Sequence, residues 1–347
     1  MEKKRVLGKR IKYNEMKFTL IICTYMRPKP LLKLLQSVQR QTVYPNEILV
    51  IDGSVNDETK ILIEENSFDN LNYFLVSEGE RGLTKQRNFG IEKASKSSVF
   101  ISFLDDDTEL LPNYFEELIK TFIDDETITG VGGVAINENN WSKAEPNKKY
   151  NFKHYNLIDG FFSKVGQRNV VRNYLGLQSN LGPGKMPDFS HGKTCGFPLS
   201  NKIYEVDLLI GMSFAFRKNV FDSIRFSTYF EGYGLYEDAD FSIRALQFGK
   251  NVINTKVQLY HFHNPSGRPN KYFYGKMVVR NGWYVWRVKN PYPKFEARLK
   301  WHSITLLLII IRFSNIFTTT KRKEAFTEAL GRAQGWISLF FYKPKRV

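Results

Sequence analysis

The chain has 347 residues, enough for one large α/β domain or two smaller ones, and its 42% hydrophobic and 15% aromatic content excludes an intrinsically disordered protein. The net charge of +16 comes mainly from the ends, because residues 1–17 hold seven Lys and Arg against two Glu and residues 291–347 hold eleven against three. The middle is nearly neutral and carries no DNA- or RNA-reading motif, which argues against a nucleic-acid binder.

The cysteines and the N-terminus bear on the compartment. Cys23 and Cys195 are the only cysteines, too few for a disulfide framework and without metal-ligand spacing, which favours a reducing compartment. Residues 1–17 form a basic extension without an apolar segment, so we expect no secretory signal there.

Strand and helix patterns alternate in the first third of the chain. Apolar, β-branched runs predict strands at 18–23, 47–52, 72–77 and 98–105, and the runs between them predict helices. This order is typical of a mostly parallel, Rossmann-like α/β sheet flanked by helices. In such sheets ligands bind beyond the carboxyl ends of the strands.

Acidic and polar residues follow these predicted strand ends. They are Thr24 to Arg27, Asp52, and the run Asp105 to Asp107. Three adjacent carboxylates repel one another, so a divalent cation such as Mg²⁺ or Mn²⁺ is their natural partner. The alternative is an acidic cap on a helix that we expect to start in "TELLPNYFEEL". A phosphatase of the haloacid dehalogenase type is disfavoured because Glu109 replaces the Thr or Val of its motif.

A second acidic site lies in the later half. After a strand at 128–137, residues 138–201 lose periodicity, and we interpret them as an insertion that shapes the acceptor side. A helix is expected from Glu237 to about Phe248 and a strand at 251–263. At the start of that helix, Glu237 or Asp238 could act as a general base, although a capping box with Asp240 is the structural alternative.

The C-terminal region, residues 271–347, is predicted to be helical. Its apolar run at 304–317 is shorter than the roughly 20 residues that a membrane-spanning helix needs. Flanking Lys, Arg and Trp residues are typical of a helix lying in a membrane interface. A helix packed on the preceding domain remains an open alternative.

Five segments, in the same order and at ordinary spacing, make the chain similar to family 2 glycosyltransferases. The resemblance covers most of residues 18–265 and implies a GT-A fold over 18–270. The segments are "FTLIICTYMRPKPLLKLLQSVQRQT", "EILVIDGSVNDET", "RGLTKQRNFGIEKA", "FLDDDTELLP" and "GYGLYEDADFSIRALQFG". The second segment departs from the family pattern, because it has one Asp where the family often has two.

The resemblance implies which residues bind the nucleotide sugar. Thr24 and Asp52 would contact the base, with Arg27 in the same loop, and Arg87 would approach the diphosphate. Asp105 and Asp106 would lie near the ribose.

The resemblance also implies the metal ligands and the base. Asp107 would ligate a divalent cation, Mn²⁺ or Mg²⁺. Similar enzymes often add a His from a later strand, and we expect His261 rather than His263. Asp238 would be the general base, with Glu237 beside it.

The resemblance therefore implies an inverting, metal-dependent glycosyltransferase. It would move a sugar from a nucleotide-diphosphate sugar to a hydroxyl of a glycan or lipid-linked acceptor, in cell-surface polysaccharide or glycoconjugate synthesis. The basic ends suggest that it acts as a peripheral protein at the anionic cytoplasmic face of a membrane, since each Lys or Arg near such a surface contributes about 1 kcal/mol. The alternative is a non-catalytic nucleotide-sugar-binding or scaffold protein of the same fold.

Overall fold

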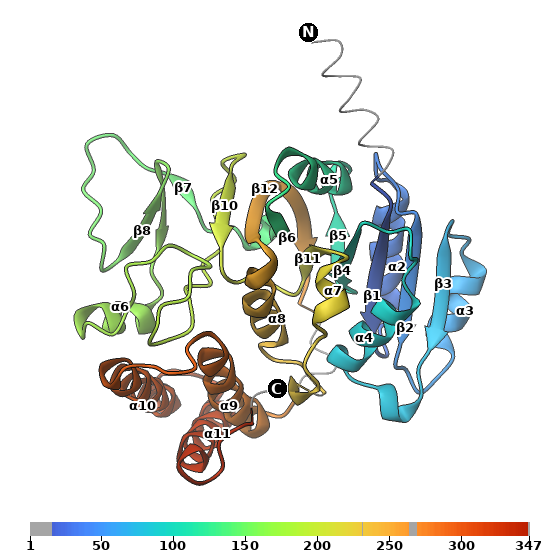
Figure 1. Cartoon of the computed structure of the whole chain (residues 1–347). Helices are drawn as coiled ribbons and strands as arrows, with labels where there is room; N and C mark the ends of the chain where they lie inside the picture. Colours follow the sequence, from blue (N-terminus) through green and yellow to red (C-terminus); the bar gives the residue numbers. More distant parts are fainter. Residues whose placement is uncertain (1–15, 231, 264–268, 346–347) are drawn as a thin grey trace. The chain divides into compact units, whose positions relative to one another are not determined.

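The computed structural model describes residues 16–230, 232–263 and 269–345, so the basic extension at 1–17 lies almost wholly outside the described residues. The chain divides into two compact units (Figure 1). Unit 1 comprises Met1–Asn139 and Leu199–Gly267, and unit 2 comprises Asn140–Pro198 and Arg268–Val347. The predicted insertion and the C-terminal helical region thus belong mostly to one unit.

Unit 1 is built around one mixed sheet, which among the described residues has nine strands in the order β10-β12-β6-β11-β4-β1-β2-β3, with β5 paired to β12. The parallel strands at one end match the sequence prediction. The strands are β1 (Phe18–Thr24), β2 (Glu47–Asp52), β3 (Leu71–Leu75), β4 (Phe100–Asp105), β5 (Thr108–Leu110), β6 (Ile128–Ala135), β10 (Ile203–Val206), β11 (Ser213–Arg217) and β12 (Lys250–His261).

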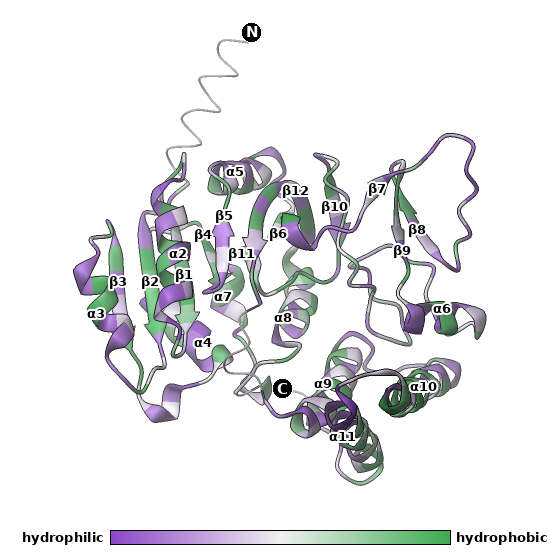
Figure 2. Cartoon of the chain, turned by 180° about the vertical axis from the view of Figure 1, so that it is seen from behind, coloured by the Kyte–Doolittle hydropathy of each residue, from purple (hydrophilic) through white to green (hydrophobic). Residues whose placement is uncertain are grey.

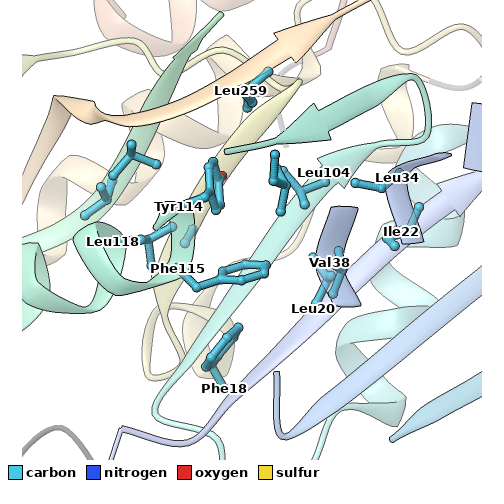
Figure 3. Packing of buried hydrophobic residues seen from close by; sticks show 14 of the residues in the cluster. Phe18, Leu20, Ile22, Leu34, Val38, Leu104, Tyr114, Phe115, Leu118 and Leu259 are labelled. Carbon is cyan, nitrogen blue, oxygen red and sulfur yellow. The ribbon is translucent and has the colours of Figure 1, made fainter. Parts of the chain in front are cut away.

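Helices of unit 1 cover both faces of this sheet. They are α2 (Pro28–Gln39), α3 (Glu58–Glu65), α4 (Leu83–Lys93), α5 (Tyr114–Asp124), α7 (Val220–Ser223) and α8 (Glu237–Ala245). On one face, alternate residues of β1 pack against apolar residues of α2 and α5. Figure 3 shows Phe18 beside Phe115 of α5, with ring centroids 4.9 Å apart. On the other face, α4 approaches β1 so closely that a Cβ at Gly90 would lie 2.8 Å from Ile21.

One local prediction is wrong. The segment "TELLPNYFEEL" does not begin as a helix, because Thr108–Leu110 forms strand β5 and the helix starts only at Tyr114. Strand β5 pairs antiparallel with β12, so that Thr108 lies opposite His261. The aspartates are therefore separated from the helix by a strand, and capping of α5 does not explain them.

Unit 2 combines a small antiparallel sheet with helices. Its strands pair in the order β7-β9-β8, and α11 packs against both α9 and α10. The elements are β7 (Ser142–Lys143), β8 (Tyr155–Ile158), β9 (Phe161–Lys164), α6 (Gln167–Tyr174), α9 (Lys271–Lys289), α10 (Phe295–Thr318) and α11 (Arg322–Phe341).

Helix α10 is longer than the sequence suggested. Among the described residues, α10 is the one helix that is long and apolar enough to cross a membrane. This criterion uses length and composition alone, and core helices of soluble proteins also meet it. Figure 2 shows much of α10 in the hydrophobic colour. Arg312, which interrupts the apolar run, pairs at 2.8 Å with Glu328 of α11. The charge is thus neutralised inside the helix pair.

Candidate active site

The parallel strands β1, β2 and β4 end level with one another. Thr24 lies opposite Asp52 in the register of β1 and β2, and Cys23 lies opposite Asp105 in that of β1 and β4. The polar residues that follow these strands therefore gather at one edge of the sheet, as the sequence predicted.

Asp106 is held by the first loop. Thr24 Oγ1 donates to Asp106 Oδ2 at 2.7 Å, and Arg27 Nη1 donates to Asp106 Oδ1 at 3.0 Å. Burial raises the pKa of Asp106 to about 7, and the neighbouring Arg27 and Thr24 oppose this rise. Asp106 thus ties the end of β4 to the loop after β1, and three residues predicted to face the nucleotide lie together.

Asp52 is also engaged within the chain. Its side chain is fully buried, Oδ1 accepts from the backbone N and Oγ of Ser54, and Oδ2 accepts from the Tyr73 hydroxyl at 2.9 Å. Burial and this hydrogen bond raise the pKa of Tyr73. For Asp52 to contact a nucleotide base as predicted, it would have to give up hydrogen bonds to Ser54 or Tyr73. This contact stays a prediction.

The other two aspartates lie with a histidine. Asp105, Asp107 and His261 each offer a ligand atom, and these atoms all lie within 4.8 Å of one another. His261 Nε2 is 3.5 Å from Asp107 Oδ1, because the pairing of β5 with β12 sets the two side by side. Burial raises the pKa of Asp105. Two carboxylates and one imidazole form a donor set that suits a divalent cation such as Mn²⁺.

His261 has carboxylates on both sides. Its Nδ1 lies 2.7 Å from Oε1 of Glu138, a residue that the sequence analysis did not single out. Burial alone would lower the pKa of His261, but Asp107 and Glu138 raise it to about 10. His263 lies outside the cluster of Asp105 and Asp107, with its Nε2 2.9 Å from Glu138.

The acidic pair opens helix α8. Tyr236 precedes it in the left-handed conformation, with φ of 71°. Burial raises the pKa of Glu237 to about 8, and its Oε1 accepts from Arg87 Nη1 at 2.5 Å. Asp238 is half-buried, its Oδ2 accepts from the Gly211 N–H at 2.9 Å, and its Oδ1 accepts from the Ala239 N–H at 2.8 Å. These two donors fix the orientation of the Asp238 carboxylate.

Arg87 joins the two acidic sites. Its side chain is 2% exposed, donates to Glu237 and to the Gly211 carbonyl, and lies 3.5 Å from Asp105 Oδ1. Burial alone would lower the pKa of Arg87, but the carboxylates raise it. The guanidinium also lies 4.9 Å from the ring centroid of Phe214. Arg87 therefore links the C-terminal end of β4 to the N-terminal end of α8. Its contact with a diphosphate stays a prediction.

Part of the chain is similar to a known protein family. Residues 19–173 match the model of glycosyl transferase family 2. Two relatives are GalNAc(5)-diNAcBac-PP-undecaprenol beta-1,3-glucosyltransferase of Campylobacter jejuni and the O-antigen chain rhamnosyltransferase RfbN of Salmonella typhimurium. The first is 33% identical over 106 residues and the second 30% over 118, which is 30% and 34% of this chain. The chain spans only 34% and 37% of these relatives' own lengths.

A solved structure shares the fold. The crystal structure of residues 1–349 of S. aureus TarS aligns over 93% of this chain and 80% of that one, with a TM-score of 0.50 and 16% identity. The mixed α/β GT-A arrangement with a C-terminal helical region, expected from the sequence, is confirmed.

Proposed function

Residues 19–173 match glycosyl transferase family 2, and from this premise we propose that the chain is an inverting glycosyltransferase of this family that uses a nucleotide-diphosphate sugar. The acceptor is a hydroxyl of a glycan or lipid-linked intermediate in cell-surface polysaccharide or glycoconjugate synthesis. The observation that carries the proposal is the cluster of Asp105, Asp107 and His261, joined through buried Arg87 to the acidic pair on α8.

The donor-binding part of the proposal rests on the edge of the sheet. Asp107 and His261, with Asp105 beside them, are the residues that would hold Mn²⁺ or Mg²⁺. A cation there would neutralise the charge that develops on the departing diphosphate. Thr24, Arg27, Asp52, Arg87 and Asp106 are proposed to face the nucleotide.

The transfer step needs a base on the acceptor side. The acceptor oxygen forms a bond to the anomeric carbon while the bond from that carbon to the phosphate oxygen breaks, and its electron pair leaves with the nucleoside diphosphate. Asp238 accepts the hydroxyl proton, with its carboxylate oriented by the Gly211 and Ala239 N–H groups. Attack opposite the leaving group inverts the anomeric centre. Glu237 is proposed to act through its ion pair with Arg87, which positions the start of α8.

We further propose that unit 2 binds an anionic membrane surface at the cytoplasmic face. Its residues include 26 Lys and Arg against 6 Asp and Glu, a net charge of +20, which leaves a net −4 for unit 1 out of the total of +16. A surface with this charge is attracted to anionic lipid headgroups.

Exposed apolar residues on unit 2 support the same proposal. On α10 they recur at intervals of 4 and 7 residues, which keeps them on one helical face, and α11 repeats the pattern. They are Phe295, Leu299, Leu306, Ile310 and Phe317 on α10, and Phe326, Leu330, Ile337 and Phe341 on α11, where Phe340 is also exposed. Both faces together have the amphipathic character of interfacial membrane helices.

Vesicle flotation tests the membrane proposal. The protein should float with phosphatidylglycerol vesicles, and a variant with Ile310→Gln and Phe317→Gln should float less. A variant with Val55→Gln and Ile61→Gln, two exposed residues of unit 1, is the matched control. Equal flotation of all three proteins would contradict a role for the α10 face.

Donor hydrolysis tests the catalytic proposal. The wild type is screened across nucleotide sugars with Mn²⁺ or Mg²⁺, alongside Asp238→Asn and the exposed control Glu64→Gln. We expect hydrolysis or transfer with one class of donor, a strong loss in Asp238→Asn, and wild-type rates in Glu64→Gln. Donor binding without turnover under every condition would instead favour the non-catalytic alternative.

A further inference from the structure

Glu138 lies at the junction of two strand ends. It closes the turn Ile136–Glu138 directly after β6, and β6 runs parallel to β12, which ends at His261. Its Oε1 lies 2.7 Å from His261 Nδ1 and 2.9 Å from His263 Nε2. The neighbouring Asn137 exchanges hydrogen bonds with the backbone of His261, at 2.7 Å and 3.0 Å. The position of Glu138 relative to His261 is thus fixed by backbone as well as side-chain contacts.

This contact determines which nitrogen of His261 faces the aspartates. An ionised carboxylate accepts hydrogen bonds but cannot donate them, so His261 Nδ1 carries the hydrogen in the contact with Glu138. The other nitrogen, Nε2, faces Asp107 Oδ1 at 3.5 Å. When Nδ1 keeps its hydrogen, the lone pair of a neutral imidazole lies on Nε2, the nitrogen that faces the cluster.

We propose that Glu138 is a positioning residue that orients His261 as a cation ligand. The inference rests on the proposed function, because it concerns the cluster of Asp105, Asp107 and His261. Carboxylates that accept from a ligating histidine fix its tautomer and ring orientation, and their loss costs about 10- to 100-fold in metal affinity. Glu138 acts through His261 and does not itself contact the cation.

Glu138, His261 and His263 also offer atoms within 4.8 Å of one another, and they could form a separate cation site. The two arrangements share His261. Burial favours the aspartate cluster, because the side chains of Asp107 and His261 are 6% and 12% exposed, whereas those of Glu138 and His263 are 40% and 56% exposed.

The experiment measures Mn²⁺ binding by the full chain, using the electron paramagnetic resonance signal of free Mn²⁺ during titration with MnCl₂ alone. We expect Glu138→Ala to weaken binding about 10- to 100-fold. Glu138→Gln should recover most of the affinity, because its amide oxygen still accepts from Nδ1–H. In a His261→Ala background, Glu138→Ala should have no further effect, a coupling that a merely structural role would not produce.

The other outcomes separate this inference from the proposed function. Asp107→Asn should also weaken binding. If it binds Mn²⁺ as tightly as the wild type, the proposed metal site is wrong and the inference fails with it. If Asp107→Asn weakens binding but Glu138→Ala does not, only the inference is overturned. If Asp107→Asn binds Mn²⁺ normally while His263→Ala and His261→Ala lose affinity as Glu138→Ala does, the cation lies at the exposed cluster of Glu138, His261 and His263 and the positioning role is contradicted.

Discussion

Replacing Arg87 by Met should destabilise unit 1 strongly. Glu237 Oε1 would lose its partner at 2.5 Å, and Oε2 of the same residue has no hydrogen bond in the structure. The Gly211 carbonyl would lose a donor at 3.1 Å. Removing one member of a buried ion pair costs about 3–5 kcal/mol, because the remaining carboxylate either stays charged without compensation or must take up a proton. We therefore expect the free energy of unfolding to fall by about 3–5 kcal/mol.

A paired variant separates charge from packing. Replacing both Arg87 and Glu237 by Met removes the uncompensated charge, so most of the lost stability should return, although activity should not. Arg87→Lys should recover only part of the free energy of unfolding that Arg87→Met loses. An ammonium lacks the planar guanidinium that donates to Glu237 and Gly211 at the same time.

Urea unfolding followed by circular dichroism measures these differences. An Arg87→Met protein within about 1 kcal/mol of the wild type would refute the reasoning, because typical surface substitutions cost no more than that. A double variant as unstable as the single one would also refute it. A rise in donor KM for Arg87→Lys at normal stability would instead support the predicted contact with the diphosphate.

Three further predictions concern catalysis, pH and packing. Asp238→Asn should lower kcat about 10²- to 10⁴-fold with little change in donor KM, measured by steady-state kinetics, because it removes only the base. Burial lowers the pKa of His302, whose Nδ1 accepts from Trp336 Nε1 at 3.0 Å, so stability should fall as pH drops below about 6.5. Melting temperatures at pH 7.5 and 5.5 should show a smaller fall in His302→Phe than in the wild type. A Cβ at Gly331 would lie 1.9 Å from the Tyr272 carbonyl, so Gly331→Ala should cost about 1–3 kcal/mol in thermal unfolding, whereas Lys323→Ala, at an exposed position of the same helix, should not.

The sequence predicted the features that depend on local pattern. Strands β1, β2 and β4 are continuous apolar runs, and polar residues follow each of them directly. The acidic pair at the start of α8 was visible for the same reason. These features needed only periodicity and the rule that ligands meet parallel strands at their carboxyl ends.

The features that the sequence could not predict depend on distant contacts. Glu138 lies 123 residues before His261 in the chain, at the start of a segment without periodicity. Arg87 and Glu237 are 150 residues apart, and their motifs alone do not show that Arg87 is buried. Strand β5 has only three residues, two of them polar, so its pairing with β12 left no local signal.

The apolar run at 304–317 is only part of α10, which begins at Phe295. Arg312 lies inside this run, where Glu328 of α11 is 2.8 Å away and offsets the cost of its charge. The exposed apolar face of α10 could not be predicted from the sequence, because it depends on which of its apolar residues are buried against other helices.

The most direct measurement of the central claim is donor hydrolysis with and without a divalent cation. After EDTA treatment the wild type should be inactive, and Mn²⁺ should restore its rate, whereas Asp107→Ala should stay inactive at the same Mn²⁺ concentration. Full activity in EDTA, or wild-type recovery by Asp107→Ala, would contradict the assignment of the aspartate cluster as the metal site of a glycosyltransferase.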